Sequence, residues 1–338
     1  MTTSVDITIL PCEVRQYIWS YCRKSSLKVL SVCCKQMYAE VKPLIWKRVE
    51  VSWESLEGIT KDLIKKPHPN LRLISCLVLD SRSQSASSLR NLSWGYLTFG
   101  LGSFLERCER LKSLTITRFL SADGPRLVST ILPQLQNLEM TDITLRAGDL
   151  KPLFGLLQLK SLKLSYCSIQ KSDWDVVWQL ESLEHLTVTH CSTPASVDCV
   201  RLKNLLSLDF FEIVESRELY SCIAWESVKL ESLDLGSSSI QDSDILSVSR
   251  LPRLKYISLY GADQVTDLGI SYLTHISCLE RLRISACYRL SPHCLVDVAK
   301  IQTLRRLDLD QFSEDDVDIS CLSNLVNLHT LIVSEMVG

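Results

Sequence analysis

The stretch Leu159-Lys160-Ser161-Leu162-Lys163-Leu164 has the pattern L-x-x-L-x-L, and Leu183-Glu184-His185-Leu186-Thr187-Val188 repeats it 24 residues later. Eleven copies of this pattern can be aligned along the chain, with other apolar residues replacing some of the leucines. Their first residues are Ile74, Leu111, Leu135, Leu159, Leu183, Leu205, Leu230, Leu254, Leu279, Leu304 and Leu328. The first step is 37 residues long and the others are 22 to 25, a regularity that chance does not explain.

A motif of this form at a period of about 20–29 residues is the signature of leucine-rich repeats. Alternating apolar residues predict a short strand with one buried face, and the apolar spacing that follows predicts a short helix. The predicted fold class is α/β: a leucine-rich-repeat solenoid with parallel strands on the concave face and helices on the convex face. A solenoid of this kind presents a long concave surface to another macromolecule.

The cysteines fit the interior of such a fold. The chain has 14 cysteines in 338 residues, and Cys167, Cys191 and Cys287 each follow the last apolar residue of a motif by three positions. That position of the repeat is occupied by inward-facing Asn or Cys. We therefore interpret these cysteines as small buried residues of a protein in a reducing compartment, the cytoplasm or the nucleus, and not as metal ligands or disulfides.

Several classes of function find no support in the residues. The net charge of −2 gives no electrostatic reason to expect a nucleic acid partner, and no uncharged apolar run is long enough to span a membrane. No signal peptide is recognised in the first twenty residues, which include Asp6, Glu13 and Arg15. Phosphate-binding, nucleophile-elbow and zinc-protease motifs are lacking, so we expect no catalytic residue, metal or cofactor.

Two segments depart from the regular repeat. The long first step contains Ser81 to Ser88, a polar stretch that predicts a loop insertion near residues 81–94. The last motif is followed by only five residues, so Leu328 to Val333 is expected either to form an exposed edge strand or to be covered by a partner.

Residues 1–50 have a different, helical apolar pattern. We expect short helices that break near Ser25-Ser26 and near Pro43, in a unit too small to fold independently. Trp46-x-x-Val49-x-Val51 is a degenerate repeat strand 28 residues before Ile74. The predicted domains are thus residues 1–50, helical, and residues 51–338, a solenoid of about eleven repeats.

This helical segment resembles an F-box. The family pattern begins with Leu-Pro and an acidic residue, continues with an Ile-Phe pair and spaced leucines, and closes with Val-Cys and Leu-Trp. The matching residues are Leu10-Pro11, Glu13, Ile18-Trp19, Leu27, Leu30, Val32-Cys33 and Ile45-Trp46, with Trp19 in place of Phe and Ile45 in place of Leu. An F-box followed by leucine-rich repeats is similar to the F-box/leucine-rich-repeat family across nearly the whole chain.

The resemblance implies a non-catalytic subunit of an SCF-type (Skp–cullin–F-box) ubiquitin ligase. Its F-box would bind a Skp adaptor, and through it a cullin-RING ligase, while its repeats would bind a protein substrate. The residues expected to make or support the adaptor contact are Leu10, Pro11, Val14, Ile18, Trp19, Leu27 and Leu30. The alternative is a non-catalytic scaffold or inhibitor whose N-terminal helices are only a cap; an exposed apolar face on those helices would favour the F-box. An enzyme is the least supported reading.

Strand alternation also predicts a substrate surface. The residues between and just after the last two apolar residues of each motif face the concave side. Most of these are small or polar, but Phe211 and Tyr260 are aromatic, and Tyr166 and His190 precede them in the stack. Neighbouring parallel strands lie about 4.8 Å apart, so these four rings are expected to form one patch. Arg283 and Lys163 are expected to flank it and to receive acidic groups of a substrate, although packing of Phe211 against a neighbouring strand is an equally good explanation.

Overall fold

The structure is a computed structural model, and it describes residues 10–52, 69–80, 101–118, 132–192, 202–211, 229–236, 240–310 and 319–334. The chain divides into two compact units, residues 1–116 and 117–338. The predicted polar loop near residues 81–94 lies outside the described residues.

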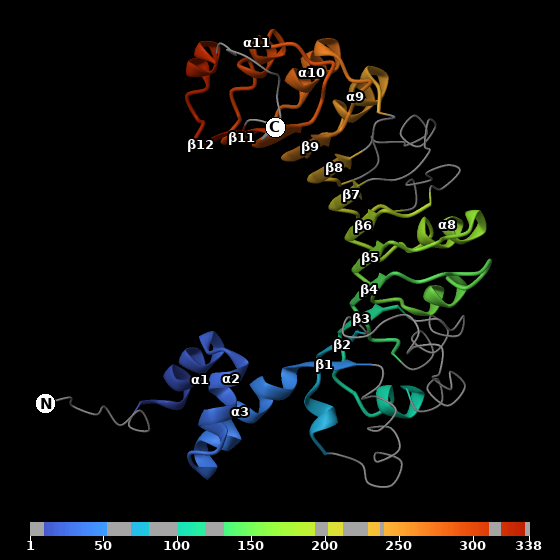
Figure 1. Ribbon diagram of the computed structural model, residues 1–338, viewed down its shortest axis with the longest axis vertical. Coiled ribbons are helices and arrows are strands. Elements are labelled where there is room, and N and C mark those ends of the chain that lie inside the picture. Colours follow the sequence, from blue (N-terminus) through green and yellow to red (C-terminus); the bar gives the residue numbers. More distant parts are fainter. Residues whose placement is uncertain are drawn as a thin grey trace, which may run out of the picture. The chain divides into compact units, whose positions relative to one another are not determined.

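The first unit begins with three helices and continues into parallel strands (Figure 1). The side chains of Trp19, Leu27 and Val41, one from each helix, form the buried centre of the helical part. The strand predicted around Val49 is confirmed, because it pairs in parallel with the first regular repeat strand. The described elements are α1 (Cys12–Tyr21), α2 (Lys24–Ser31), α3 (Lys35–Lys47), β1 (Arg48–Ser52), η2 (Pro69–Leu73), β2 (Cys76–Asp80) and β3 (Ser113–Thr117).

The predicted break near Ser25-Ser26 is placed about two residues too late, and the predicted break near Pro43 is wrong. Helix α2 runs through Ser25-Ser26, and Pro43 lies inside α3. The actual breaks come where the backbone is extended, at Arg23 before α2 and at Cys34 before α3. Cys34 caps α3 by accepting a hydrogen bond from the Met37 amide at 3.4 Å, a role usually taken by Ser, Thr, Asp or Asn.

The second unit is a stack of repeat strands in chain order (Figure 1). From β4 to β12, the register advances one repeat at a time, so that Leu162, Leu186 and Leu208 stand side by side. Its described strands are β4 (Asn137–Thr141), β5 (Ser161–Ser165), β6 (His185–Thr189), β7 (Ser207–Phe211), β8 (Ser232–Gly236), β9 (Tyr256–Tyr260), β10 (Arg281–Ser285), β11 (Arg306–Asp310) and β12 (Thr330–Ser334). Its described helices are η3 (Lys151–Gly155), α8 (Lys171–Val177), α9 (Asp242–Val248), α10 (Asp267–Tyr272), η6 (Leu273–His275), α11 (Cys294–Val298) and η7 (Ser320–Asn324).

The motif residues form the core between strands and helices. The second and fourth residues of the strands from β4 to β11 are buried, as strand alternation requires. Helices α9, α10 and α11 lie next to one another along one side of the strands (Figure 1). The predicted leucine-rich-repeat architecture is therefore confirmed.

Aspartates tie successive repeats together at the start of the helices. The Asp242 carboxylate accepts from the Thr266 amide at 2.8 Å, and the Asp267 carboxylate accepts from the Ser291 amide at 2.8 Å. Thr266 itself caps α10, where its hydroxyl accepts from the Leu268 amide. Thr266 thus caps α10, whereas Asp267 links this helix to the next repeat.

The buried cysteines satisfy the backbone of the turns that follow the strands. The Cys167 amide donates to Cys191 Sγ at 3.3 Å, and the Cys167 thiol lies 3.4 Å from the Met140 carbonyl oxygen of the preceding repeat. Burial raises the pKa of the Cys287 thiol to about 11. These contacts explain why the repeat favours a small side chain with hydrogen-bonding capacity at this position.

We predict that Cys167, Cys191 and Cys287 resist a thiol-alkylating reagent in the native protein at neutral pH, because alkylation requires an exposed thiolate. Cys12 and Cys33 are exposed and should react rapidly, so they serve as internal controls. A time course followed by mass spectrometry measures both groups. Equal rates for buried and exposed cysteines would contradict the structure.

Strand β12 has the character of a sheet edge. It pairs with β11, and its residues Leu331, Ile332 and Val333 are exposed in the isolated chain. Whether a partner covers this strand stays a prediction.

Candidate functional site

The first, third and fifth residues of each strand form the sheet face opposite the buried leucines, which we call the open face. In β6 these residues are His185, Thr187 and Thr189, which alternate with the buried Leu186 and Val188. Most open-face residues of the second unit are polar or small. Three features distinguish this region: a group of aromatic side chains, a pair of aspartates and a polar hollow.

The aromatic group comprises Tyr166, His190, Phe211 and Tyr260, and we call it the aromatic row. The rings of Tyr166 and His190 stack with centroids 4.3 Å apart. His190 meets Phe211 edge to face at 5.7 Å, and Phe211 lies 5.0 Å from Tyr260. The expected adjacency of the four rings is confirmed, whereas their role in substrate binding stays a prediction.

Two of these rings lie on turns of unusual backbone conformation. Tyr166 and His190 have positive φ angles of 53° and 52°. Their amides donate to the carbonyl oxygens of Thr189 and Phe211 in the next strand. A left-handed conformation costs a residue other than glycine about 1–2 kcal/mol. The same turn in consecutive repeats brings the two side chains one repeat apart, where their rings stack.

Gly236 accounts for the contact between Phe211 and Tyr260, which lie two strands apart. Phe211 is in register with Gly236, and Gly236 is in register with Tyr260. A Cβ atom on Gly236 would lie 2.7 Å from Phe211 Cδ2, closer than carbon atoms can approach. The missing side chain therefore lets the Phe211 ring lie across β8. A lone glycine within a strand often marks such a close approach, and the sequence analysis did not use this signal.

The two basic residues expected to flank the aromatic row have acidic neighbours on the open face. Lys163 Nζ lies 2.9 Å from Glu139 Oε1 of the preceding strand. Arg283 Nη2 lies 3.6 Å from Asp310 Oδ2 of the following strand. Their charges are thus balanced within the protein, which weakens the expectation that they receive acidic groups of a substrate.

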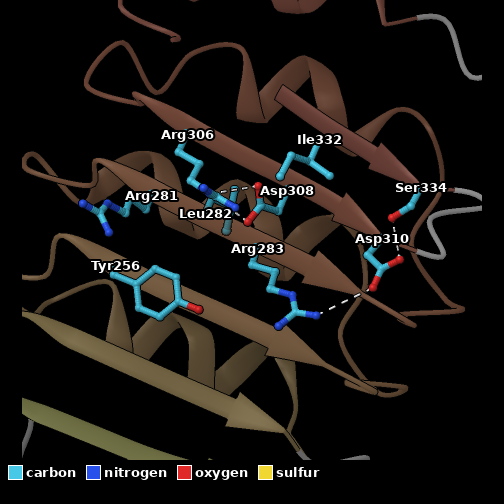
Figure 2. A pocket seen from close by; sticks show the side chains of 9 residues that line it. All are labelled: Tyr256, Arg281, Leu282, Arg283, Arg306, Asp308, Asp310, Ile332 and Ser334. Carbon is cyan, nitrogen blue, oxygen red and sulfur yellow. Dashed lines mark hydrogen bonds and ion pairs between the residues drawn. The ribbon is translucent and has the colours of Figure 1, made fainter. Parts of the chain in front are cut away.

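Arg283 belongs to a polar hollow of about 470 Å³ on the open face of β9 to β12 (Figure 2). Arg306 Nε donates to both oxygens of Asp308 at 3.1 and 3.0 Å, and Asp310 accepts from the Ser334 hydroxyl at 2.6 Å. The residues that line the hollow are Tyr256, Arg281, Leu282, Arg283, Arg306, Asp308, Asp310, Ile332 and Ser334.

The acidic pair is formed by Asp209 and Asp234, which are register partners on β7 and β8. Burial, together with the charge of Asp234, raises the pKa of Asp209 to about 6, and Lys163 opposes this shift. Burial also raises the pKa of Asp234. Within the described structure, Asp234 Oδ1 is buried without a hydrogen-bond partner.

We predict that Asp209→Asn raises the free energy of unfolding at pH 7.5. The folded pKa of about 6 exceeds the unfolded value of 3.8, so the folded state loses stability as the pH rises between these values and stays penalised above them. Because Asp209 is partly exposed, solvent screening reduces the expected gain in unfolding free energy to about 1 kcal/mol. Urea unfolding at pH 7.5 and pH 4 measures it. A gain in stability that is equal at both pH values would contradict the raised pKa of Asp209.

The helices of the first unit present exposed apolar side chains. Val14, Tyr17 and Tyr21 lie at helical spacing on α1, and Val29 and Val32 lie on and just after α2. These side chains are between 43% and 81% exposed. We call these five residues the apolar helix face.

The seven residues expected at the adaptor contact divide by burial. Trp19 and Leu27 are buried core residues, so they can support a contact but cannot make one. Ile18, Leu30 and Leu10 are half-buried, whereas Pro11 and Val14 are exposed. The predicted adaptor contact did not include Val32, which was part of the F-box match, and the sequence reasoning missed Tyr17, Tyr21 and Val29. The two tyrosines repeat the helical spacing of Val14.

A buried ion pair fixes α1 against α3. The Glu40 carboxylate accepts from Arg15 Nη2 at 2.5 Å and from Trp19 Nε1 at 3.1 Å. Arg15 also donates to the carbonyl oxygen of Leu10. The hydrogen bonds from Arg15 and Trp19 lower the pKa of Glu40 to about 2. The chain entering α1 and the spacing of the helices thus depend on one carboxylate.

We predict that the helices lose stability in acid through Glu40. The unfolded pKa is 4.5, so the contribution is complete above that value and disappears as the pH falls through the folded pKa of about 2. Glu40→Gln should cost about 1–3 kcal/mol at pH 7, because the partly buried Arg15 loses the carboxylate that accepts its hydrogen bonds. The difference in urea midpoint between wild type and variant should shrink between pH 5 and pH 3. A difference independent of pH would contradict this role.

Two classes of site are not found in the described residues. They contain no group of three or more His, Cys, Asp or Glu side chains placed to hold a metal ion. Among the described helices, none combines the length and apolarity needed to cross a membrane.

Comparison with known proteins supports the fold. No protein-family profile and no curated protein sequence matches the chain. Among solved structures, the chain is similar to the TLR13–ssRNA13 complex, with 17% identity over 85% of this chain and 43% of that chain and a TM-score of 0.50. It also matches internalin C2 of Listeria monocytogenes, with 20% identity over 69% of this chain and 83% of that one and a TM-score of 0.37. The plant peptide hormone receptor RGFR1 in complex with RGF2 matches with 16% identity over 67% and 32% of the two chains and a TM-score of 0.35.

Proposed function

We propose that this protein is the substrate-recognition subunit of an SCF-type ubiquitin ligase. In this proposal residues 1–50 bind a Skp adaptor, and through it a cullin-RING ligase, while the open face of the repeats binds a protein substrate. The chain performs no chemistry itself. It raises the effective concentration of substrate lysines near the conjugating enzyme.

The apolar helix face is the observation that carries this proposal. A helical cap should be polar on its solvent side, because a solenoid needs its ends to be soluble. Here Val14, Tyr17 and Val32 are exposed while a separate set of residues, centred on Trp19, fills the core. An exposed apolar surface that the fold does not need for its own core is typical of a protein interface. Because the same helices match the F-box pattern, we propose a Skp adaptor as the partner at that interface.

The alternative is a leucine-rich-repeat scaffold or inhibitor without a role in ubiquitination. The open face supports this function equally well, because it serves any protein ligand. The two functions differ only in what the apolar helix face binds.

Co-expression of the full chain with a Skp adaptor and a cullin tests the proposal. We expect a complex that survives size-exclusion chromatography, and we expect Leu10→Ala/Pro11→Ala to weaken it while the repeats stay folded. Retention of the adaptor by that variant would contradict the assignment of Leu10 and Pro11. Absence of any complex for the wild type would favour the scaffold.

A further inference from the structure

The acidic pair lies on the open face of β7 and β8, and no cation of the described residues forms an ion pair with it. Asp209 and Asp234 occupy equivalent positions on adjacent strands, so their backbones are about 4.8 Å apart. None of the ion pairs among the described residues includes either carboxylate. Lys163 on β5 and Arg283 on β10 are each separated from the pair by one strand, and each has its own acidic neighbour.

Beside the pair, the described residues leave some hydrogen-bonding capacity unused. Ser258 is in register with Asp234 on the next strand, and its side chain is 0% exposed. Neither its Oγ atom nor Asp234 Oδ1 makes a hydrogen bond of normal geometry with the described residues, although the hydroxyls of Ser258 and Tyr256 lie near enough to Asp234 to lower the pKa of that carboxyl. Buried polar atoms without partners cost free energy, and they are typical of places where a ligand completes the bonding.

An aromatic surface adjoins the two carboxylates. Phe211 follows Asp209 by two residues on β7, so both side chains lie on the open face. The Phe211 ring covers Gly236, which follows Asp234 by two residues on β8, and continues to Tyr260. Aromatic faces attract ammonium and guanidinium groups and pack against the methylene stems of lysine and arginine.

These features together select a cationic side chain as the ligand. A positive charge between Asp209 and Asp234 would relieve the repulsion between them, and an N–H donor would satisfy Asp234 Oδ1. A divalent metal ion fits less well, because the described residues place no third His, Cys, Asp or Glu beside the pair. A lysine or arginine needs only acceptors, a negative potential and an apolar wall for its stem.

We infer that the open face between β7 and β9 binds a lysine or arginine side chain of a protein partner, with the cation between Asp209 and Asp234 and the stem against Phe211. This inference rests on the proposed role of the open face in substrate binding. It assigns the partner a basic residue, whereas the sequence analysis expected acidic groups.

The test is an array of twelve-residue peptides with uncharged random flanks and a central Lys, Arg, Glu or norleucine, probed with the full-length chain. We expect the Lys and Arg peptides to capture at least ten times more protein than the Glu and norleucine peptides. Asp209→Asn/Asp234→Asn should abolish this preference. The matched control Asp175→Asn/Asp297→Asn removes two charges from helices α8 and α11 and should keep it.

Two further measurements separate a loss of binding from a loss of folding. Asp209→Asn/Asp234→Asn should unfold at the same or a higher temperature than wild type, since it removes a repulsion, so misfolding does not account for lost capture. Gly236→Ala, which displaces the Phe211 ring but keeps both carboxylates, should reduce capture of Lys and Arg peptides several-fold. Equal capture of Glu and Lys peptides by the wild type, or an unchanged preference in the double Asn variant, would overturn the inference.

Adaptor binding by the same variants separates this inference from the proposed function. The double Asn variant should bind the Skp adaptor as tightly as wild type, because the acidic pair lies on the repeats. If the wild type binds the adaptor but shows no preference for basic peptides, the inference fails alone. If it prefers basic peptides but binds no adaptor, the ubiquitin-ligase role fails and the basic-residue site stands.

Discussion

Replacing Leu233 with alanine should lower the free energy of unfolding of the second unit by about 2–5 kcal/mol, because the side chain is fully buried and its loss leaves a cavity. Leu233 stands between Leu208 and Ile257 in the register of β7, β8 and β9. In a solenoid each repeat is stabilised by its neighbours, so a cavity here weakens two interfaces at once. Urea unfolding followed by circular dichroism measures the change.

The matched control is Val326→Ala, an apolar truncation at a side chain that is 80% exposed. It should change the free energy of unfolding by no more than about 0.5 kcal/mol. A loss of similar size in the two variants would mean that the motif leucines do not form the core. A small loss for Leu233→Ala alone would mean that β8 is not packed as the structure has it.

The repeat strands are predictable from the sequence because one pattern encodes both their position and their buried face. Each of the eleven motifs coincides with a strand from β2 to β12, and the weaker signal at Val49 and Val51 coincides with β1. The buried cysteines are predictable for the same reason, since their distance from the strand is constant. The break near Ser25 was placed about two residues late and the break near Pro43 was wrong, because the decisive signals, an extended Arg23 and a cysteine cap at Cys34, are weak in sequence.

The candidate site is only partly predictable, because contacts on the open face join residues one or two repeats apart. Alternation and period place Phe211 and Tyr260 on the same face, and the strand spacing predicts that they come close. Which carboxylate pairs with Lys163 or with Arg283 depends on side-chain rotamers and on the residues of the adjacent strands. The pattern of leucines specifies neither of these. Only the packed structure shows that Ser258 Oγ lacks a hydrogen bond of normal geometry with the described residues.

The apolar helix face should dominate binding to the Skp adaptor. We expect Tyr17→Ser/Val29→Ser/Val32→Ser to weaken the full chain's affinity for the adaptor by about 100-fold or more, because exposed aromatic and aliphatic anchors each contribute about 2 kcal/mol or more to an interface. These residues are exposed and make no part of the buried centre formed by Trp19, Leu27 and Val41, so the helices should stay folded. The matched control Tyr288→Ser/Val296→Ser/Val326→Ser makes the same three replacements at exposed sites on the repeats.

The most direct test of the ubiquitin-ligase assignment is the dissociation constant of the purified full-length chain for a Skp adaptor, measured by titration calorimetry for wild type and both triple variants. The account predicts tight binding by the wild type and by the control on the repeats, and a loss of about 100-fold or more for the variant of the apolar helix face. Wild-type binding no tighter than that of the Tyr17/Val29/Val32 variant, in proteins with identical helical content, would contradict it.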